Sequence, residues 1–176
     1  KTTEILDHES DSVVKVVIRG TDRGGLQIEN EVSVLVQDVN EAPDLTFGPL
    51  KLEVDENIPD TIWVWTTSDP DGDGVSVAKK DGEQADFFEV NEGELRLVKP
   101  ANFETETELA VVLVVTDAKG LSVEKRFVFA VNDVNEVPQG ITISHESIAE
   151  NAAIGTEIGE LGASDVDAGD THVFAL

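Results

Sequence analysis

The sequence predicts an all-β chain made of tandem Greek-key β-sandwich repeats of the immunoglobulin-like type. Two observations lead to this prediction. A sequence pattern recurs after about 95 residues, and short runs rich in Val, Leu and Phe are bounded by Gly, Asp, Asn and Pro. A unit of about 100 residues with roughly seven short strands is typical of an immunoglobulin-like sandwich.

An acidic motif that ends in proline marks the internal repeat. Asp38-Val39-Asn40-Glu41-Ala42-Pro43 returns 95 positions later as Asp133-Val134-Asn135-Glu136-Val137-Pro138. Thr21-Asp22 returns at the same spacing as Thr116-Asp117. Internal periods of this kind indicate tandem structural units.

The period divides the chain into three parts. We expect a C-terminal half-repeat over 1–43, one complete repeat over 44–138, and an N-terminal half-repeat over 139–176. Each half lacks the strands that the other half supplies, so only 44–138 is expected to close a core alone. The sequence has no methionine, and we expect it to be a piece of a longer protein.

The apolar runs within each repeat have the periodicity of strands. Val32-Ser33-Val34 and Glu94-Leu95-Arg96-Leu97 alternate with period two, as half-buried strands do. The clearest strands are predicted over Val13 to Ile18, Glu31 to Val36, Leu109 to Val115 and Val123 to Val131. The motif that ends in proline falls between repeats. It is predicted to be an extended linker, because proline disfavours the helical region for the preceding residue.

The charge of the chain excludes several classes of protein. It has 37 acidic and 12 basic residues, a formal net charge of -25, so nucleic-acid binding is not expected. It has no cysteine, which excludes a disulfide scaffold and a Cys-ligated zinc site. The longest apolar run, 109–115, is far shorter than the roughly 20 residues that span a bilayer. No direct membrane insertion of this segment is therefore expected.

The acidic residues gather in turns and at the repeat boundaries. Calcium takes six to eight oxygen ligands, more than any single short segment here supplies. A junction can supply them, because strand ends, a linker and the loops of the next repeat converge there. Carboxylates held that close repel one another without a cation between them. Solvated turn acids are the alternative, and the constant period of the whole set favours calcium.

These motifs resemble the cadherin family, specifically the bacterial cadherin-like tandem repeats of large surface or secreted adhesins. The elements that carry the resemblance are the following: Leu6-Asp7-His8-Glu9 for L-D-R-E, Asp38 to Pro43 for the D-x-N-D-N-x-P linker, Glu56 and Glu150 for x-E-x, Asp69-Pro70-Asp71 for D-x-D, and Asp117 for the final A-x-D.

The resemblance implies about three calcium ions at a complete junction, held by carboxylate and carbonyl oxygens. At the first junction, between 1–43 and 44–138, the implied ligands are Asp7, Glu9, Asp38, Asn40, Glu41, Asp69, Asp71 and Asp117. The backbone carbonyls of Val39 and Ala42 would add oxygens. At the second junction, between 44–138 and 139–176, the implied ligands are Glu56, Glu104, Asp133, Asn135, Glu136, Asp165 and Asp167.

Several positions depart from the family pattern. Asn102 stands where L-D-R-E has Asp, which is expected to weaken the outermost ion of the second junction. Both linkers carry Glu, at positions 41 and 136, where the family has Asp. Asp22 and Glu150 match ligand positions of junctions that this chain does not complete.

An EF-hand and an enzyme are both disfavoured. Asp69 to Gly74 begins like an EF-hand loop, but its twelfth position is Lys80 where a bidentate Glu is required. No nucleophile-elbow motif is present. The three histidines (His8, His145 and His172) lack metal-ligand spacing and are expected to be surface residues. Trp63 and Trp65 are expected on opposite faces of one strand, one of them in the core and the other partly exposed.

The expected function is that of a calcium-binding, calcium-rigidified, non-enzymatic repeat region of a cell-surface or secreted adhesin. Its partners would be other copies of the same repeats or a cell-surface ligand or glycan. The alternative is a structural spacer, or a polysaccharide-binding module that uses Trp63 or Trp65.

Overall fold

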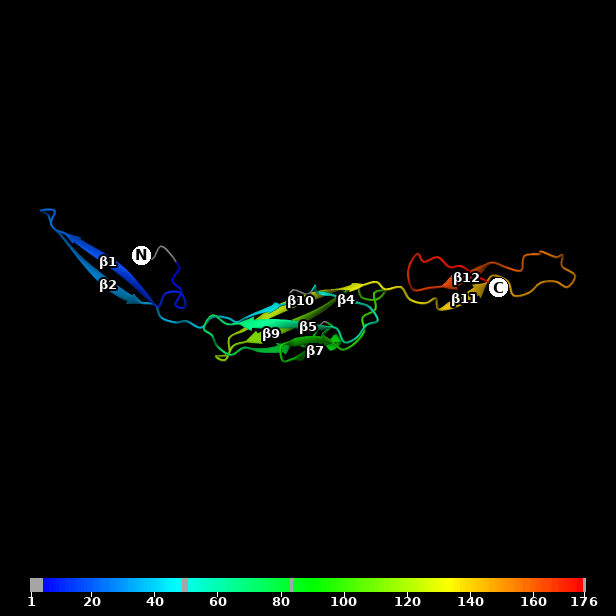
Figure 1. Ribbon diagram of the computed structural model, residues 1–176, viewed down its shortest axis with the longest axis horizontal. Helices are drawn as coiled ribbons and strands as arrows, with labels where there is room; N and C mark the ends of the chain where they lie inside the picture. Colours follow the sequence, from blue (N-terminus) through cyan, green and yellow to red (C-terminus); the bar gives the residue numbers. More distant parts are fainter. Residues whose placement is uncertain (1–4, 49–50, 83, 176) are drawn as a thin grey trace.

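A computed structural model describes residues 5–48, 51–82 and 84–175. The chain is elongated and has three parts in series, a hairpin, a β-sandwich and a second hairpin with long loops (Figure 1). The first hairpin pairs β1 (Val13–Thr21) with β2 (Gln27–Leu35), and the second pairs β11 (Gly140–Ile143) with β12 (Leu161–Ser164). Among the described residues, no helix is long and apolar enough to cross a membrane.

The sandwich has two sheets of four strands each. One sheet has the order β3-β5-β8-β7, formed by Asp44–Phe47, Ile62–Ser68, Glu94–Leu97 and Phe88–Asn91. The other has the order β4-β10-β9-β6, formed by Glu53–Asp55, Ser122–Asn132, Glu108–Thr116 and Ser76–Lys79. A single 3-10 turn, η1 (Ala85–Phe87), is the one helical segment in the described part of the chain. The all-β sandwich predicted from the sequence is confirmed.

The first strand region of the sandwich is divided between the two sheets. β3 pairs antiparallel with β5, whereas β4 pairs parallel with β10, with Val54 opposite Val131. The seven strands expected from the sequence therefore appear as eight in the part of 44–138 that the structure describes. Every other strand pair in the sandwich is antiparallel.

The core lies between the two sheets and is built from the inward-facing residues of the alternating strands. Leu109, Val111, Leu113 and Val115 of β9 are all buried, as the period of two requires. An aromatic cluster fills the centre, where the rings of Trp63 and Phe129 are 4.3 Å apart. The core residues all belong to 44–138.

Both tryptophans of β5 face this core, so the expectation that they lie on opposite faces is wrong. Residues two apart in a strand point to the same side of the sheet. Trp63 is 2% exposed, and Trp65 packs partly buried against the same core. The residue between them, Val64, is the one that faces solvent, at 48% exposed.

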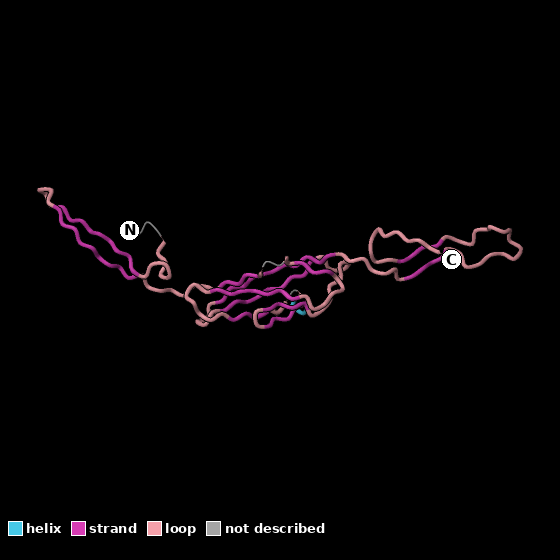
Figure 2. Tube along the Cα trace, viewed as in Figure 1, coloured by secondary structure: helices cyan, strands magenta, loops and turns pink. Residues whose placement is uncertain are grey.

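The first hairpin has the same spacing as the β9–β10 pair of the sandwich. β1 and β9 have nine residues each and begin 95 positions apart. β2 and β10 also begin 95 positions apart, but β2 has nine residues and β10 has eleven. In the hairpin, however, the strands are almost entirely exposed, and Val17 is 59% accessible. Figure 2 shows the reason, since no second sheet in the described part of the chain covers the hairpin.

Candidate metal centres

The first junction begins with a tight turn built around Asp7. The Asp7 side chain accepts hydrogen bonds from the backbone N–H of Glu9 at 3.0 Å and from Ser10 Oγ at 2.8 Å. The Ser10 hydroxyl is the main cause that lowers the pKa of Asp7. The Asp11 N–H closes the turn on the Asp7 carbonyl at 2.9 Å. This turn presents Glu9 towards the linker.

Acidic side chains from three chain segments meet behind this turn. Carboxylate oxygens of Glu9, Glu41 and Asp71 lie within 4.8 Å of one another. The Glu41 N–H donates to Asp71 Oδ2 at 3.0 Å, which ties the linker to the β5–β6 loop. Asp38 shares a hydrogen bond with the Asp71 carboxyl, and this contact raises the pKa of Asp38. For Glu41, desolvation and then the charge of Glu9 raise the pKa.

The linker is fixed to the sandwich by Asn40. Its Nδ2 donates to Asp117 Oδ2 at 2.6 Å, and this bond is the main cause that lowers the pKa of Asp117. Asp117 is 5% exposed, and its Oδ1 also accepts the Leu121 N–H at 2.8 Å. The amide oxygen of Asn40 is buried and accepts no hydrogen bond.

The β5–β6 loop brings Asp69, Asp71 and Asp73 together, with carboxylate oxygens within 4.8 Å. Each of the three has one buried oxygen without a hydrogen-bond partner. The Lys119 ammonium lies 3.1 Å from Asp73 Oδ2 and 3.5 Å from Asp71 Oδ1 without hydrogen-bond geometry. Asp73 and Lys119 were not in the predicted site. The third aspartate in Asp69-Pro70-Asp71-Gly72-Asp73 was a visible signal, whereas Lys119 had none.

The second junction centres on Glu56, which is 0% exposed. Its carboxylate accepts the N–H of Phe103 at 2.8 Å and the N–H of Val134 at 2.9 Å. These bonds join the loop before β9 to the linker that follows β10. Oxygens of Glu56, Glu104 and Glu136 lie within 4.8 Å of one another.

The remaining predicted residues of this junction follow the pattern of the first. The Glu136 N–H donates to Asp167 Oδ2 at 2.7 Å, as Glu41 does to Asp71. Glu104, Asp133 and Asp167 form another close group. Desolvation, followed by the charges of Asp167 and Glu56, raises the pKa of Asp133. One carboxylate oxygen of Glu136 is buried without a partner.

Two details distinguish the second junction. Asn102 Oδ1 accepts the Thr105 N–H at 3.0 Å, so Asn102 occupies the same kind of turn as Asp7 but without the charge. Asp165 Oδ2 lies 2.8 Å from His172 Nε2, and His172 is the main cause that lowers the pKa of Asp165. His172 therefore contacts an acidic side chain and is not the plain surface residue that was expected.

Asn135, the counterpart of Asn40, makes a local contact in the linker. Its Nδ2 donates to the Glu136 carbonyl at 2.9 Å.

The two residues set aside in the sequence analysis lie in the hairpins. Asp22 Oδ1 accepts the Leu26 N–H at 2.8 Å in the β1–β2 turn, just as Asp117 accepts Leu121 in the β9–β10 turn. Glu150 lies exposed in a turn. The residues that follow Glu56 and Glu150, Asn57 and Asn151, both have positive φ, at 61° and 63°, a conformation that Asn tolerates better than most residues.

The oxygens of both junctions fit a hard divalent cation. Buried polar atoms normally have hydrogen-bond partners, so unpartnered buried oxygens require an explanation. Five such oxygens occur among the described residues, on Asn40, Asp69, Asp71, Asp73 and Glu136, and all five lie at a junction. Carboxylate and amide oxygens are the ligands that calcium prefers. A cation between them would also offset the like charges that, after the Asp71 hydrogen bond and desolvation for Asp38 and after desolvation for Asp133, help to raise the pKa values of these two residues.

No family model matches the chain, but the proteins that are similar to it in sequence are of one kind, cadherins and protocadherins. It is 29% identical to chimpanzee (Pan troglodytes) protocadherin gamma-A2 over 178 residues, covering 93% of the chain and 19% of that protein. It is 27% identical to the Caenorhabditis elegans cadherin EGF LAG seven-pass G-type receptor fmi-1, covering 93% of the chain and 7% of that protein. The chain thus spans about a fifth or less of the length of these relatives.

Solved structures agree with the sequence relatives. Extracellular cadherin domains 1–4 of protocadherin gamma B7 match 94% of the chain at a TM-score of 0.61 and 20% identity, over 44% of that structure. The protocadherin gamma B4 extracellular domain matches 93% of the chain at 0.55 and 25% identity, over 28% of that structure. A protocadherin gamma B7 cis-dimer structure matches 96% of the chain at 0.55 and 22% identity, over 43% of that structure. The chain is therefore similar in sequence and structure to the extracellular repeats of cadherins and protocadherins, and it shares their immunoglobulin-like β-sandwich fold.

Proposed function

We propose that the chain is a calcium-rigidified repeat region of an extracellular adhesin, with calcium bound at both junctions. The observation that carries this proposal is the convergence of acidic side chains from two repeats and the linker between them, together with the buried oxygens at the junctions that have no hydrogen-bond partner. The proposed ligands are the fifteen residues expected from the sequence, together with Asp73 and the carbonyls of Val39 and Ala42. The boundaries at 43 and 138 are part of the same proposal.

The proposed role of these residues is mechanical and not enzymatic. Without a cation, like charges such as those of Asp38 and Asp71 repel, and the linker is held mainly by single hydrogen bonds from Asn40 and Glu41. Calcium adds positive charge among these oxygens, of which Lys119 contacts only those of Asp71 and Asp73, and links both repeats through shared ligands. The array then becomes a stiff rod that presents a distal binding surface. Millimolar extracellular calcium is enough to fill sites of modest affinity.

Thermal unfolding tests the calcium sites directly. Calcium should raise the melting temperature of the sandwich over that in chelator, because a ligand bound only by the folded state stabilises it by about 2.7 kcal/mol at 100 times its Kd. Magnesium should have little effect. Asp71→Asn should remove the part of the gain that the first junction supplies, whereas Asp81→Asn, at an exposed bend, should leave the whole gain intact. Equal melting in calcium and chelator would contradict the proposal.

Adhesion is the second part of the proposal. The solved relatives include a protocadherin cis-dimer, which favours contact between copies of the repeats. Calcium-dependent self-association, measured by light scattering on a chain of two or more complete repeats, is the expected result. The source is proposed to be a large bacterial surface or secreted protein. The relatives named above are animal proteins, so this point stays a prediction from the sequence motifs.

The alternative is a spacer or polysaccharide-binding module. One observation favours glycan binding, an open groove of about 500 Å³ lined by Trp65, Val77, Asn91 and Glu92 among others. A partly exposed indole beside polar groups can contact a sugar. Trp63 is unsuitable because it is buried. Polysaccharide binding that disappears in Trp65→Ala would favour this alternative over adhesion between repeats.

A further inference from the structure

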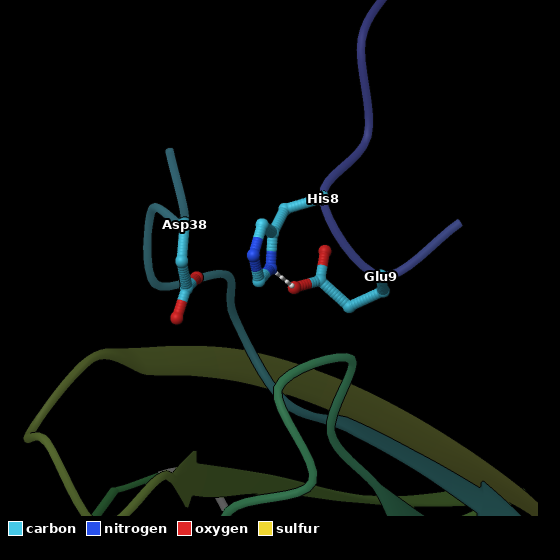
Figure 3. A group of neighbouring side chains, drawn as sticks. All are labelled: His8, Glu9 and Asp38. Atoms are coloured by element: carbon cyan, nitrogen blue, oxygen red, sulfur yellow. Dashed lines mark hydrogen bonds and ion pairs between the residues drawn. The ribbon is translucent and has the colours of Figure 1, made fainter. Parts of the chain in front are cut away.

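The turn that begins the first junction places an imidazole beside two carboxylates. His8 and Glu9 project from the turn closed by Asp7 and Asp11, and Asp38 projects from the linker after β2 (Figure 3). One ligand atom of each of these three residues lies within 4.8 Å of the others. His8 Nδ1 is 3.1 Å from Glu9 Oε1.

We propose that His8, Glu9 and Asp38 form a binding site for zinc or a similar divalent transition-metal ion. Calcium favours oxygen ligands, whereas imidazole suits zinc, copper and nickel. Two ligands of one tetrahedral zinc ion, each at about 2.0–2.1 Å, lie about 3.3–3.4 Å apart. The separation of His8 Nδ1 and Glu9 Oε1 is already close to that value.

The third ligand comes from a segment remote in the sequence. Asp38 is exposed and Glu9 is exposed, so modest rotations of these side chains can shorten the remaining distances to those of metal bonds. The backbone of the turn is held by the bonds that Asp7 accepts, so His8 and Glu9 are presented on a fixed frame. Water completes the coordination, since three protein ligands leave a fourth position open.

The second junction serves as a natural negative control. The position equivalent to His8, 95 residues later, is Phe103, which packs against the core of the sandwich. Glu104 and Asp133 correspond to Glu9 and Asp38, so this junction keeps the two carboxylates and lacks the imidazole. The proposed zinc site therefore belongs to the first junction alone. It shares Glu9 and Asp38 with the proposed calcium set but does not depend on calcium binding.

The test is a zinc titration of the 176-residue chain in calcium-free buffer at neutral pH. His8→Gln should weaken zinc affinity by at least about tenfold, since losing even a group that only orients a metal ligand costs about 10–100-fold. His172→Gln, next to Asp165, and His145→Gln, next to Ser144, are the matched controls and should leave it unchanged. His8→Gln should keep the calcium-dependent rise in melting temperature, which separates this proposal from the calcium sites.

A second measurement needs no variant. In the unaltered chain, one equivalent of zinc should shift the imidazole nitrogen resonances of His8 and leave those of His145 and His172 in place. Unchanged affinity in His8→Gln would overturn the proposal. A shift of the His172 resonances with none at His8 would also overturn it.

Discussion

The backbone N–H of Glu41 donates a hydrogen bond of 3.0 Å to Oδ2 of Asp71, which joins the linker to a loop of the repeat that follows it. The same bond recurs at the second junction, from Glu136 to Asp167 at 2.7 Å. The two junctions are thus built on one plan, and differences between them can be tested by exchanging single residues.

Glu56 should stabilise the sandwich through its two backbone hydrogen bonds. Glu56→Ala leaves the part-buried N–H groups of Phe103 and Val134 without their acceptor. We expect the free energy of unfolding in chelator to fall by about 2–4 kcal/mol, because each unsatisfied buried donor costs about 1–3 kcal/mol. Urea unfolding measures this. Glu150→Ala, at the equivalent exposed position, should change it by less than about 0.5 kcal/mol. Equal effects of the two substitutions would contradict this account of Glu56.

Asn102→Asp should strengthen calcium binding at the second junction. Asp7 shows that a carboxylate fits this turn, since it accepts the same kind of backbone hydrogen bond as Asn102. The added charge should raise calcium affinity by roughly fivefold, because calcium sites are tuned by the charge of their ligands. It should also lower the melting temperature in chelator. Calorimetric titration measures the affinity, and an unchanged value would place residue 102 outside the site.

Lys119 should weaken calcium binding at the first junction. Its ammonium lies 3.1 Å from Asp73 Oδ2 and supplies positive charge where a cation would bind. Because Lys119 is half-exposed, we expect Lys119→Gln to raise calcium affinity only about two- to fivefold, the range of an exposed ion pair. Lys80→Gln, which removes the pair with Glu124 on the sheet surface, is the control. A loss of affinity in Lys119→Gln would show that Lys119 supports the site instead.

In chelator, stability should rise and then fall as the pH decreases. The folded pKa of Asp133 is raised above 3.8, so its charge destabilises the folded state at neutral pH, and this cost disappears as the pH falls through the raised pKa. The folded pKa of Asp117 is lowered below 3.8, so its stabilisation is present above 3.8 and is lost as the pH falls through the lowered value. Urea midpoints across this range measure both effects.

Saturating calcium should reverse the first of these effects. Calcium binds the charged form of Asp133, so acidification should then only destabilise the chain. A chelator curve that falls steadily from neutral pH would contradict the repulsion inferred at the second junction.

Most of the fold and of the candidate site could be predicted from periodicity. The predicted calcium ligands lie in turns and linkers. The period of 95 residues indicates which turns belong to the same junction. For this reason, Glu41 could be grouped with Asp71, and Glu104 with Asp133, without coordinates. The fifteen predicted residues lie at the two junctions as grouped. Whether they bind calcium remains the prediction.

The parts that could not be predicted depend on packing. The contact of Lys119 with Asp71 and Asp73 arises from the approach of two loops that sequence spacing does not encode. The division of the first strand between the sheets is also a tertiary feature. The error on Trp63 and Trp65 was different in kind, because a period of two already places both rings on one face of β5.

The parallel pairing of β4 with β10 also determines how the sandwich carries tension. The preceding linker leads into β3, and the chain continues from β3 into β4, whereas the following linker leaves the end of β10. Tension that is passed on through β3 therefore pulls β4 and β10 in opposite directions along two strands that run the same way. The hydrogen bonds between β4 and β10 are therefore loaded in shear. They must break at the same time, whereas bonds loaded perpendicular to the strands break one after another. An array of such repeats would resist stretching between its two ends through the few residues 53–55 and 130–132 in each sandwich.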